Sequence, residues 1–198
     1  MGGFEIQHGI APEHIEAAAY LHFRAFRDKL GPVLGRAANA EAFYRSTMNP
    51  QFAISALTPD GTDLLGVAGF KTADGAFIGG TFSDLKRHYG FAGALWRGLV
   101  LSALDRGVEP DRLLMDGIAV MPEARGQGIG SALLEAIVLE AYRRGKGHVR
   151  LDVIDSNPRA RALYERHGFV AGRTRHLGPL RHVFGFRSAT MMLKSVHV

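Results

Sequence analysis

The chain has 198 residues, of which 46% are hydrophobic and 22% are charged, and it contains no cysteine. This length supplies enough apolar side chains for a core, so we expect residues 1–198 to form a single domain. The absence of cysteine excludes a disulfide framework, a thiolate metal site and a covalent cysteine nucleophile.

The net charge of +5 is carried largely by arginines that are scattered along the chain. Acidic residues such as Glu135, Asp152 and Glu165 lie among them. A mixed surface is therefore expected, and no nucleic-acid partner. The nine histidines show no paired ligand spacing, so no metal site is expected. Without a signal peptide or a long apolar run, the protein is expected to be soluble, cytoplasmic and without contact with a membrane.

The first part of the chain predicts a strand, two helices and a hairpin. The first helix begins at Pro12 and carries an apolar side, and Gly31-Pro32 is expected to end it. Pro59-Asp60-Gly61 predicts the turn of the hairpin. The expected elements are a strand at 4–7, a helix with Ile15, Ala18, Ala19, Phe23 and Phe26 on one side, a helix at 38–46, and strands at 52–57 and 64–70.

Residues 72–111 follow the hairpin and are expected to be helical. Apolar residues recur with helical spacing over 91–104, and a shorter helix is expected over 81–89. We expect this segment to cover the exposed face of the sheet or to meet a second subunit, rather than to contact a substrate. Trp96 is expected in the core.

An apolar strand over 113–120 ends before Pro122, and an amphipathic helix follows. Gly126, Gly128 and Gly130 lie between them. Glycines let the backbone approach a ligand, and a helix N-terminus favours anions, so this segment predicts a diphosphate site. The G-x-G-x-G spacing differs from the G-x-G-x-x-G fingerprint of dinucleotide sites. A P-loop would need a lysine directly before Ser131, and Gly130 stands there. A glycine-rich helix entry without a ligand stays open as an alternative.

A second motif follows the strand expected at 149–154. Ser156 or Asn157 can cap a helix, Pro158 suits its first turn, and Gly168 can end it. A final strand is expected near 190–194. The motif reads Asn157-x-x-Ala160-x-x-x-Tyr164-x-x-x-Gly168-Phe169.

Together, this motif and the Arg125-x-x-Gly128-x-Gly130 loop resemble the GCN5-related N-acetyltransferase (GNAT) superfamily over about residues 112–170. The resemblance implies an α/β (α+β) fold with a mixed, twisted, mostly antiparallel sheet and helices on both faces. It makes residues 72–111 a helical insertion before the cofactor-binding strand, because the family passes this point by a short turn.

The resemblance also implies direct acetyl transfer from acetyl-CoA to a primary amine of a small molecule or peptide. The backbone near Ile118, Ala119 and Val120 would pair with pantetheine, and Asn157 would bind the same part. The residues expected to contact coenzyme A are Ile118, Ala119, Val120, Arg125, Gly126, Gln127, Gly128, Ile129, Gly130, Ser131, Asn157, Ala160 and Tyr164.

Two residues are candidates for the chemistry. Tyr164 matches the family's general acid, with a core aromatic residue as the alternative. Asp116 is the candidate base because alternate residues of a strand lie on one face, so it is expected on the same face as Ile118 and Val120. A structural aspartate, or water as the base, stays equally open.

Acceptor specificity is expected from residues 23–35 and 173–187. The second stretch is basic and aromatic, so Arg175 and Arg181 suggest an acceptor with a carboxylate or phosphate. A non-catalytic acyl-CoA sensor and a basic interaction module are the alternative functions. A homodimer is possible, and the acceptor and acyl length are not fixed by the sequence.

Overall fold

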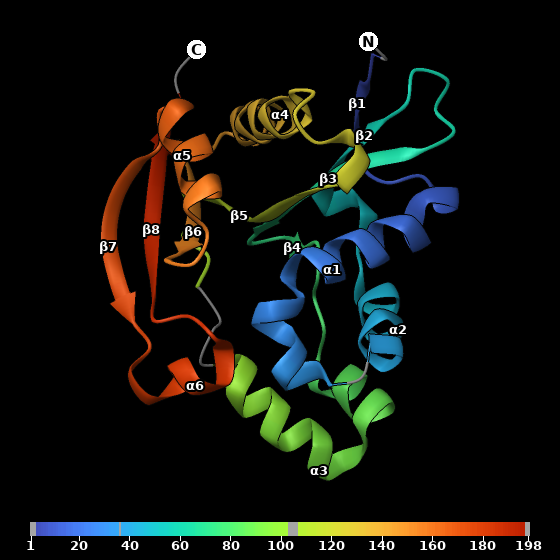
Figure 1. Ribbon diagram of the computed structural model, residues 1–198, viewed down its shortest axis with the longest axis vertical. Helices are drawn as coiled ribbons and strands as arrows, with labels where there is room; N and C mark the ends of the chain where they lie inside the picture. The colour runs from blue at the N-terminus through green and yellow to red at the C-terminus, as the bar shows by residue number, and fades with distance from the viewer. Residues whose placement is uncertain (1–2, 36, 103–106, 197–198) are drawn as a thin grey trace.

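A computed structural model gives the structure of residues 3–35, 37–102 and 107–196 (Figure 1). The helices are α1 (Ile15–Leu34), α2 (Ala37–Thr47), α3 (Phe82–Ser102), α4 (Ile129–Arg143), α5 (Pro158–Arg166) and α6 (Arg181–Phe184). The strands are β1 (Glu5–His8), β2 (Ala53–Leu57), β3 (Leu64–Thr72), β4 (Gly75–Ala76), β5 (Arg112–Val120), β6 (His148–Ile154), β7 (Val170–His176) and β8 (Ser188–Ser195).

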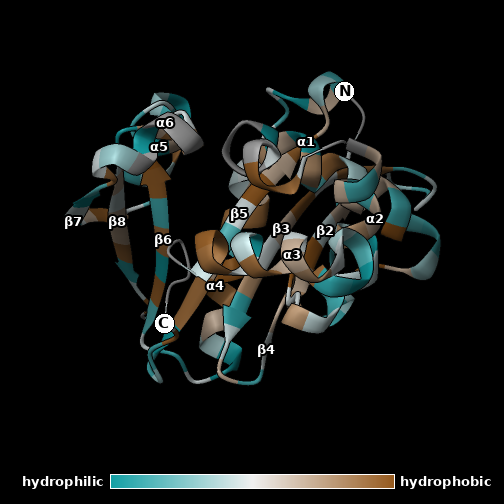
Figure 2. Ribbon diagram, turned by 90° about the horizontal axis from the view of Figure 1, so that it is seen from below, coloured by the Kyte–Doolittle hydropathy of each residue, from teal (hydrophilic) through white to brown (hydrophobic). Residues whose placement is uncertain are grey.

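The strands form one mixed sheet in the order β1-β2-β3-β5-β6-β8-β7, and β4 pairs with β3. The β5–β6 pair is parallel, whereas the other pairs along this order are antiparallel. Helix α1 lies on one side of β2, β3 and β5, and α4 lies on the other side (Figure 2). The expected fold, a mostly antiparallel sheet with helices on both faces, is confirmed.

Two glycines let the helices approach this sheet closely. A Cβ atom on Gly66 of β3 would lie 3.1 Å from a methyl carbon of Leu133 in α4. A Cβ atom on Gly117 of β5 would overlap with the ring of Phe26 in α1. Side chains at these positions would therefore push the helices off their respective faces.

Strands β5 and β6 part soon after they begin. Among the described residues they are paired at Arg112–Leu114 with His148–Arg150, and Figure 1 shows them diverging beyond that point. The rest of β5 is paired with β3 on its other side. The sheet therefore opens between Met115–Val120 and Leu151–Ile154.

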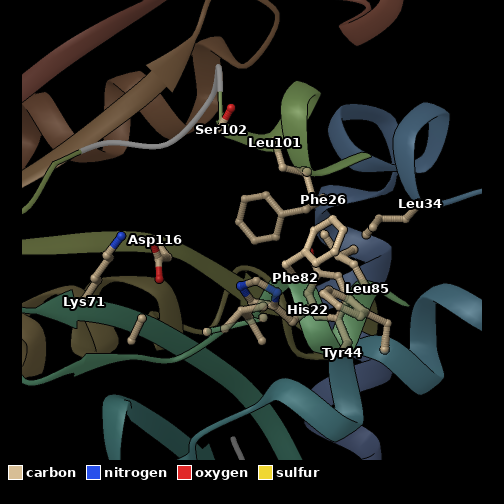
Figure 3. Close-up of a pocket in the computed structure, with 16 residues that line it drawn as sticks. His22, Phe26, Leu34, Tyr44, Lys71, Phe82, Leu85, Leu101, Ser102 and Asp116 are labelled. Carbon is tan, nitrogen blue, oxygen red and sulfur yellow. The ribbon is translucent and has the colours of Figure 1, made fainter. Parts of the chain in front are cut away.

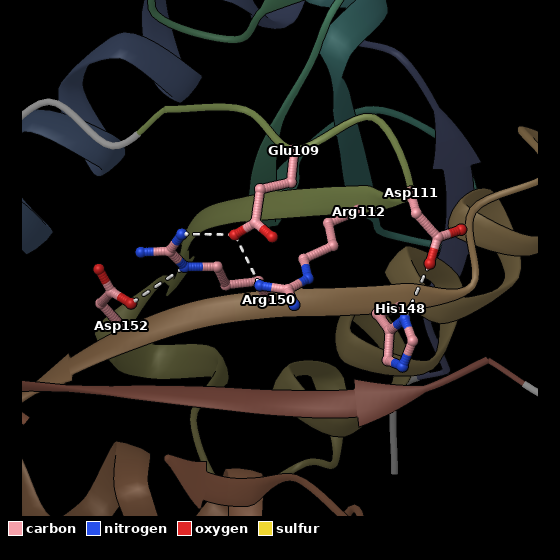
Figure 4. A network of polar contacts seen from close by, with 6 residues as sticks. All are labelled: Glu109, Asp111, Arg112, His148, Arg150 and Asp152. Carbon is pink, nitrogen blue, oxygen red and sulfur yellow. Dashed lines mark hydrogen bonds and ion pairs between the residues drawn. The ribbon is translucent and has the colours of Figure 1, made fainter. Parts of the chain in front are cut away.

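A network of charged side chains holds the two strands together before the opening (Figure 4). Glu109 Oε1 accepts hydrogen bonds from Arg112 at 2.6 Å and from Arg150 at 3.3 Å. Asp111 accepts hydrogen bonds from the Gly147 amide at 2.9 Å and pairs with His148 Nδ1 at 3.1 Å. These contacts join the start of β5 to the start of β6.

The structure corrects two expectations about helices. Gly31-Pro32 does not end α1, which continues to Leu34 and stops at Gly35 with φ 78°. Proline in a last turn removes one hydrogen bond, and the extension buries both Val33 and Leu34. Trp96 is 43% exposed, not in the core, and the Arg97 guanidinium lies 4.4 Å from its ring centre.

Of the segment 72–111 expected to be helical, residues 82–102 form α3, with a break at Gly90 (φ 69°) between its two halves, whereas residues 75–76 form β4. Leu104, at the end of the expected second helix, lies outside the described residues. Helix α3 packs on α1 and α2 rather than on the sheet, so the expectation that it covers the sheet is wrong.

Candidate functional site

The glycine loop connects β5 to α4 and leaves backbone donors at the helix start. Gly126 (φ 80°) and Gly128 (φ 85°) adopt conformations that L side chains avoid, and nothing lies within 4 Å of a Cβ built on either. A hydrogen bond from the Ala132 amide to the Gly128 carbonyl spans 3.1 Å at the start of α4. The amides of Ile129, Gly130 and Ser131 precede that bond, so the helix itself supplies them no acceptor.

The side chains of the loop leave this backbone accessible. Arg125, Gly126, Gln127 and Gly128 are exposed, and the Arg125 Nε donates to the Val120 carbonyl at 3.2 Å. This contact keeps the guanidinium beside the end of β5. Ile129 is 1% exposed, so its side chain belongs to the core and is not available to a ligand. The open loop and the helix dipole suit a phosphate group.

Helix α5 packs beside the start of α4 and brings the second motif to the loop. Leu163 of α5 lies 3.7 Å from a Cβ built on Gly130. The Asn157 Oδ1 caps α5 by accepting from the Ala160 amide at 3.1 Å, as expected for a cap. This bond uses the side-chain oxygen, so the amide nitrogen of Asn157 is the group that could reach a ligand.

Tyr164 lies in the main core at 8% exposure, with its ring 5.9 Å from that of Phe169. Burial raises the pKa of the Tyr164 phenol to about 12. The phenol therefore holds its proton at neutral pH and can donate a hydrogen bond.

Asp116 occupies a β-bulge in β5. Gly117 pairs with Gly69 and Met115 with Phe70, so Asp116 is the additional residue between these pairs. A bulge bends its strand and redirects the local side chains. Asp116, Ile118 and Val120 are all half-buried, whereas Ala119 is buried. Asp116 nevertheless lines a cavity on the α1 side, the side on which a Cβ of Gly117 would meet Phe26. The expectation that Asp116 shares a face with Ile118 and Val120 is therefore wrong, because the bulge interrupts the alternation.

A cavity of about 720 Å³ lies at Asp116 (Figure 3). It is lined from α1, α2, α3, β3, β4, β5 and the segment after β4. Burial raises the pKa of Tyr44 in its wall far above the usual value, and the negative charge of Asp116 adds to this shift. The lining residues are His22, Phe26, Leu34, Phe43, Tyr44, Lys71, Ala76, Ile78, Gly79, Gly80, Phe82, Leu85, Gly98, Leu101, Ser102 and Asp116.

The sequence-predicted specificity stretches are only partly found at this cavity. Phe26 and Leu34 of the first stretch line it. Arg173 and Arg175 of the second line a separate cavity of about 240 Å³ with Arg150 and Asp152. Phe184 and Phe186 are buried and pack in one cluster with Val33. The side chains of Phe184 and Phe186 therefore belong to the core, and a role of the arginines of 173–187 in acceptor specificity stays a prediction.

Sequence reasoning did not identify His22, Tyr44 and Lys71 as residues of this site. It also expected the segment that contains α3 not to contact a substrate, whereas α3 forms part of the cavity wall. The apolar period of α1 and α2 marked their buried sides and gave no sign that these sides enclose a space. Among the described residues, no helix is long and apolar enough to span a membrane, and no cluster of side chains could hold a metal ion.

The comparisons with known proteins agree with this geometry. The thialysine N-epsilon-acetyltransferase of Bos taurus is 41% identical over 56 residues, which are 28% of this chain and 33% of that protein. The ribosomal protein bS18-alanine N-acetyltransferase of Escherichia coli strain K12 is 44% identical over 59 residues, 30% of this chain and 40% of that protein. The chain thus spans between a third and two fifths of the length of these relatives.

The fold also matches solved structures over most of their length. The crystal structure of the ribosomal-protein-S18-alanine N-acetyltransferase from Escherichia coli superposes with a TM-score of 0.61 at 20% identity, covering 99% of this chain and 96% of that one. A model of the Acetyltransferase (GNAT) family matches residues 36–169, which is more than half of the chain. The protein belongs to the GNAT family of acetyltransferases.

Proposed function

We propose that this protein is an N-acetyltransferase that moves the acetyl group of acetyl-CoA to a primary amine. The observation that carries this proposal is that the sheet opens beside both the glycine loop and Asp116. The exposed glycine loop follows the end of β5, and the bulged Asp116 lies within the part of β5 that has left β6. A donor on the α4 side and an acceptor on the α1 side could meet through this opening.

The donor site would use backbone more than side chains. Amides of Gly126 through Ser131, with Arg125, would bind the pyrophosphate, and Ile118 to Val120 would pair with the pantetheine amides. Asn157 and Ala160 at the start of α5, together with Tyr164, would contact the same arm. Each charge-assisted hydrogen bond contributes about 1.5–3 kcal/mol, so several could support micromolar binding after ordering costs.

When bound, acetyl-CoA supplies a thioester: the amine nitrogen bonds to its carbonyl carbon, the carbon–sulfur bond breaks, and the electron pair leaves on sulfur. Asp116 would hold the acceptor's ammonium group and take a proton from its nitrogen. A lysine-like ammonium costs roughly 4.6 kcal/mol to deprotonate at pH 7, and an α-amine about 1 kcal/mol, so the base matters most for the former.

Tyr164 would stabilise the departing thiolate. Its pKa of about 12 lies above that of a thiol, so donating a hydrogen bond is easier than giving up the proton. Its burial also favours a second candidate, a sensor that binds acyl-CoA without transfer, because a core tyrosine needs no chemical role.

Calorimetry with acetyl-CoA tests the donor site. Gly128→Glu would place a carboxylate against the pyrophosphate and should raise the Kd at least 30-fold. Gly145→Glu is the matched control, because Gly145 also has a positive φ (64°) and open space but lies beyond the other end of α4. It should change the Kd less than twofold, with matching circular dichroism for all three proteins.

Equal loss of binding in both variants, or no binding by the folded wild type, would overturn the donor site. Release of thiol in the presence of an amine would then separate the two functions. Binding with amine-dependent thiol release supports the transferase, and binding without it supports the sensor.

A further inference from the structure

We propose that the acceptor is a monoamine on an apolar body about the size of an aromatic ring, and that α3 selects it. This inference rests on the proposed transferase function and names its substrate class. It is carried by the distribution of charge in the 720 Å³ cavity and by the two halves of α3, which both form part of the cavity wall.

The cavity is charged at one end and largely apolar elsewhere, with His22, Tyr44 and Ser102 as further polar side chains in its wall. Figure 3 shows Lys71 and Asp116, from the neighbouring strands β3 and β5, at one end, with Phe26, Leu85 and Tyr44 beyond them. Among the described residues that line the cavity, Asp116 is the one acid. An ammonium group at Asp116 would therefore direct the rest of the acceptor toward the aromatic and aliphatic side chains.

This arrangement disfavours acceptors with several cations. With the first ammonium group at Asp116, a second one would lie among side chains that carry no negative charge, and burying a charge without a partner is costly. An apolar body instead loses water-exposed surface against Phe26, Phe43 and Leu101. By the usual contribution of a buried methylene, each one added to the body should raise kcat/KM about fourfold.

Both halves of α3 contribute to the wall. Phe82 and Leu85 come from the first half, and Gly98, Leu101 and Ser102 come from the second. A Cβ on Gly98 would lie 3.7 Å from Phe82 and 3.9 Å from Leu85, so the break at Gly90 folds the two halves against each other. Helix α3 thus sets the depth of the apolar end.

The direct test measures thiol release from acetyl-CoA with a series of amines. Propylamine, pentylamine and heptylamine should show rising kcat/KM, and 2-phenylethylamine should exceed spermidine at least 30-fold. A flat series, or a preference for spermidine, would overturn the inference while leaving the transferase function intact.

A pair of variants on α3 tests the role of the wall. Leu101 lines the cavity, whereas Leu99 is 74% exposed on the same helix. Leu101→Glu should lower kcat/KM for 2-phenylethylamine at least tenfold and should shift the preference toward 1,5-diaminopentane. Leu99→Glu should change both values less than twofold. Equal effects of the two variants would overturn the assignment.

Circular dichroism and the acetyl-CoA Kd establish that each variant is folded. If Leu101→Glu does not fold, Gly98→Leu narrows the same cavity without a charge, and it should discriminate against 2-phenylethylamine but not propylamine. If acetyl-CoA binds but no amine releases thiol, the transferase function fails. Saturation-transfer NMR then tests the cavity: 2-phenylethylamine binding that Leu101→Glu abolishes supports the inference, and its absence overturns it.

Discussion

The Nε2 atom of His167 lies 3.0 Å from the Oγ atom of Ser131, and this hydrogen bond joins the end of α5 to the first turn of α4. The two sequence motifs, separated by 36 residues at these positions, are thereby held as one unit. The Nδ1 atom of the same imidazole lies 3.7 Å from Glu135 on α4. The orientation of the glycine loop thus depends on a side chain from the other motif.

Replacing His167 with alanine should therefore loosen the loop. We expect a loss of about 1 kcal/mol in the free energy of unfolding, typical of one hydrogen bond, and a three- to tenfold higher Kd for acetyl-CoA. Urea unfolding and calorimetry measure the two effects. Ser195→Ala, at the exposed end of β8, is the control and should change neither. An unchanged Kd for His167→Ala would show that the bond does not position the loop.

Asp116→Asn should lower kcat/KM about 100-fold at pH 7 with a lysine-like amine, the low end of the range for general bases. The deficit should shrink as the pH approaches 10, because more of the amine is then already neutral. A pH profile of thiol release measures this difference between the two proteins. A deficit that is constant across the profile would instead indicate a structural role for Asp116.

Tyr164→Phe should lower kcat about tenfold or more while changing the Kd for acetyl-CoA less than twofold, since it removes the hydrogen bond to the departing sulfur. Single-turnover thiol release and calorimetry measure the two values. An unchanged kcat would leave Tyr164 as a core residue.

The same phenol should make stability depend on alkaline pH. Its pKa is about 12 in the folded chain and about 10 in the unfolded chain, so its contribution is present below pH 10 and is lost as the pH rises toward 12. Between pH 9 and pH 11 the wild type should lose about 1 kcal/mol more than Tyr164→Phe in urea unfolding. Parallel losses in the two proteins would contradict the raised pKa.

Gly117→Ala should destabilise the protein by about 1–3 kcal/mol, because its methyl group would overlap with the Phe26 ring. A second substitution, Phe26→Leu, should recover part of this loss, so the two effects should not add. Urea unfolding of both single variants and of the double variant measures the coupling. Strict additivity would show that the overlap is not the cause.

The parts of the fold that the sequence predicted are governed by local chemistry. Pro158, Asn157 and Gly168 act within one helix, and Gly126 and Gly128 each adopt the positive φ that only glycine tolerates well. The roles of Asp116 and Tyr164 stay proposals, and the structure adds a bulge at one and burial at the other.

The parts that the sequence did not predict depend on contacts between distant segments. Strand β7 is exposed along its whole length, so it has no alternating pattern to reveal it. Trp96 and Leu99 share the apolar helical period of α3, yet both are exposed, whereas Leu101, which lies outside that period, lines the cavity. Periodicity gives the spacing of a helix face but not the surface that the face meets.

Beyond Leu114, among the described residues, the side of β5 that faces β6 is not paired with a strand. Backbone groups of a strand point alternately to its two sides, so those of Ile118 to Val120 that do not face β3 are directed into the opening. A ligand arm with its own amides would serve there as a substitute strand. Substrate binding would then complete the secondary structure, and at a ligand concentration of 100 Kd it would stabilise the fold by about 2.7 kcal/mol.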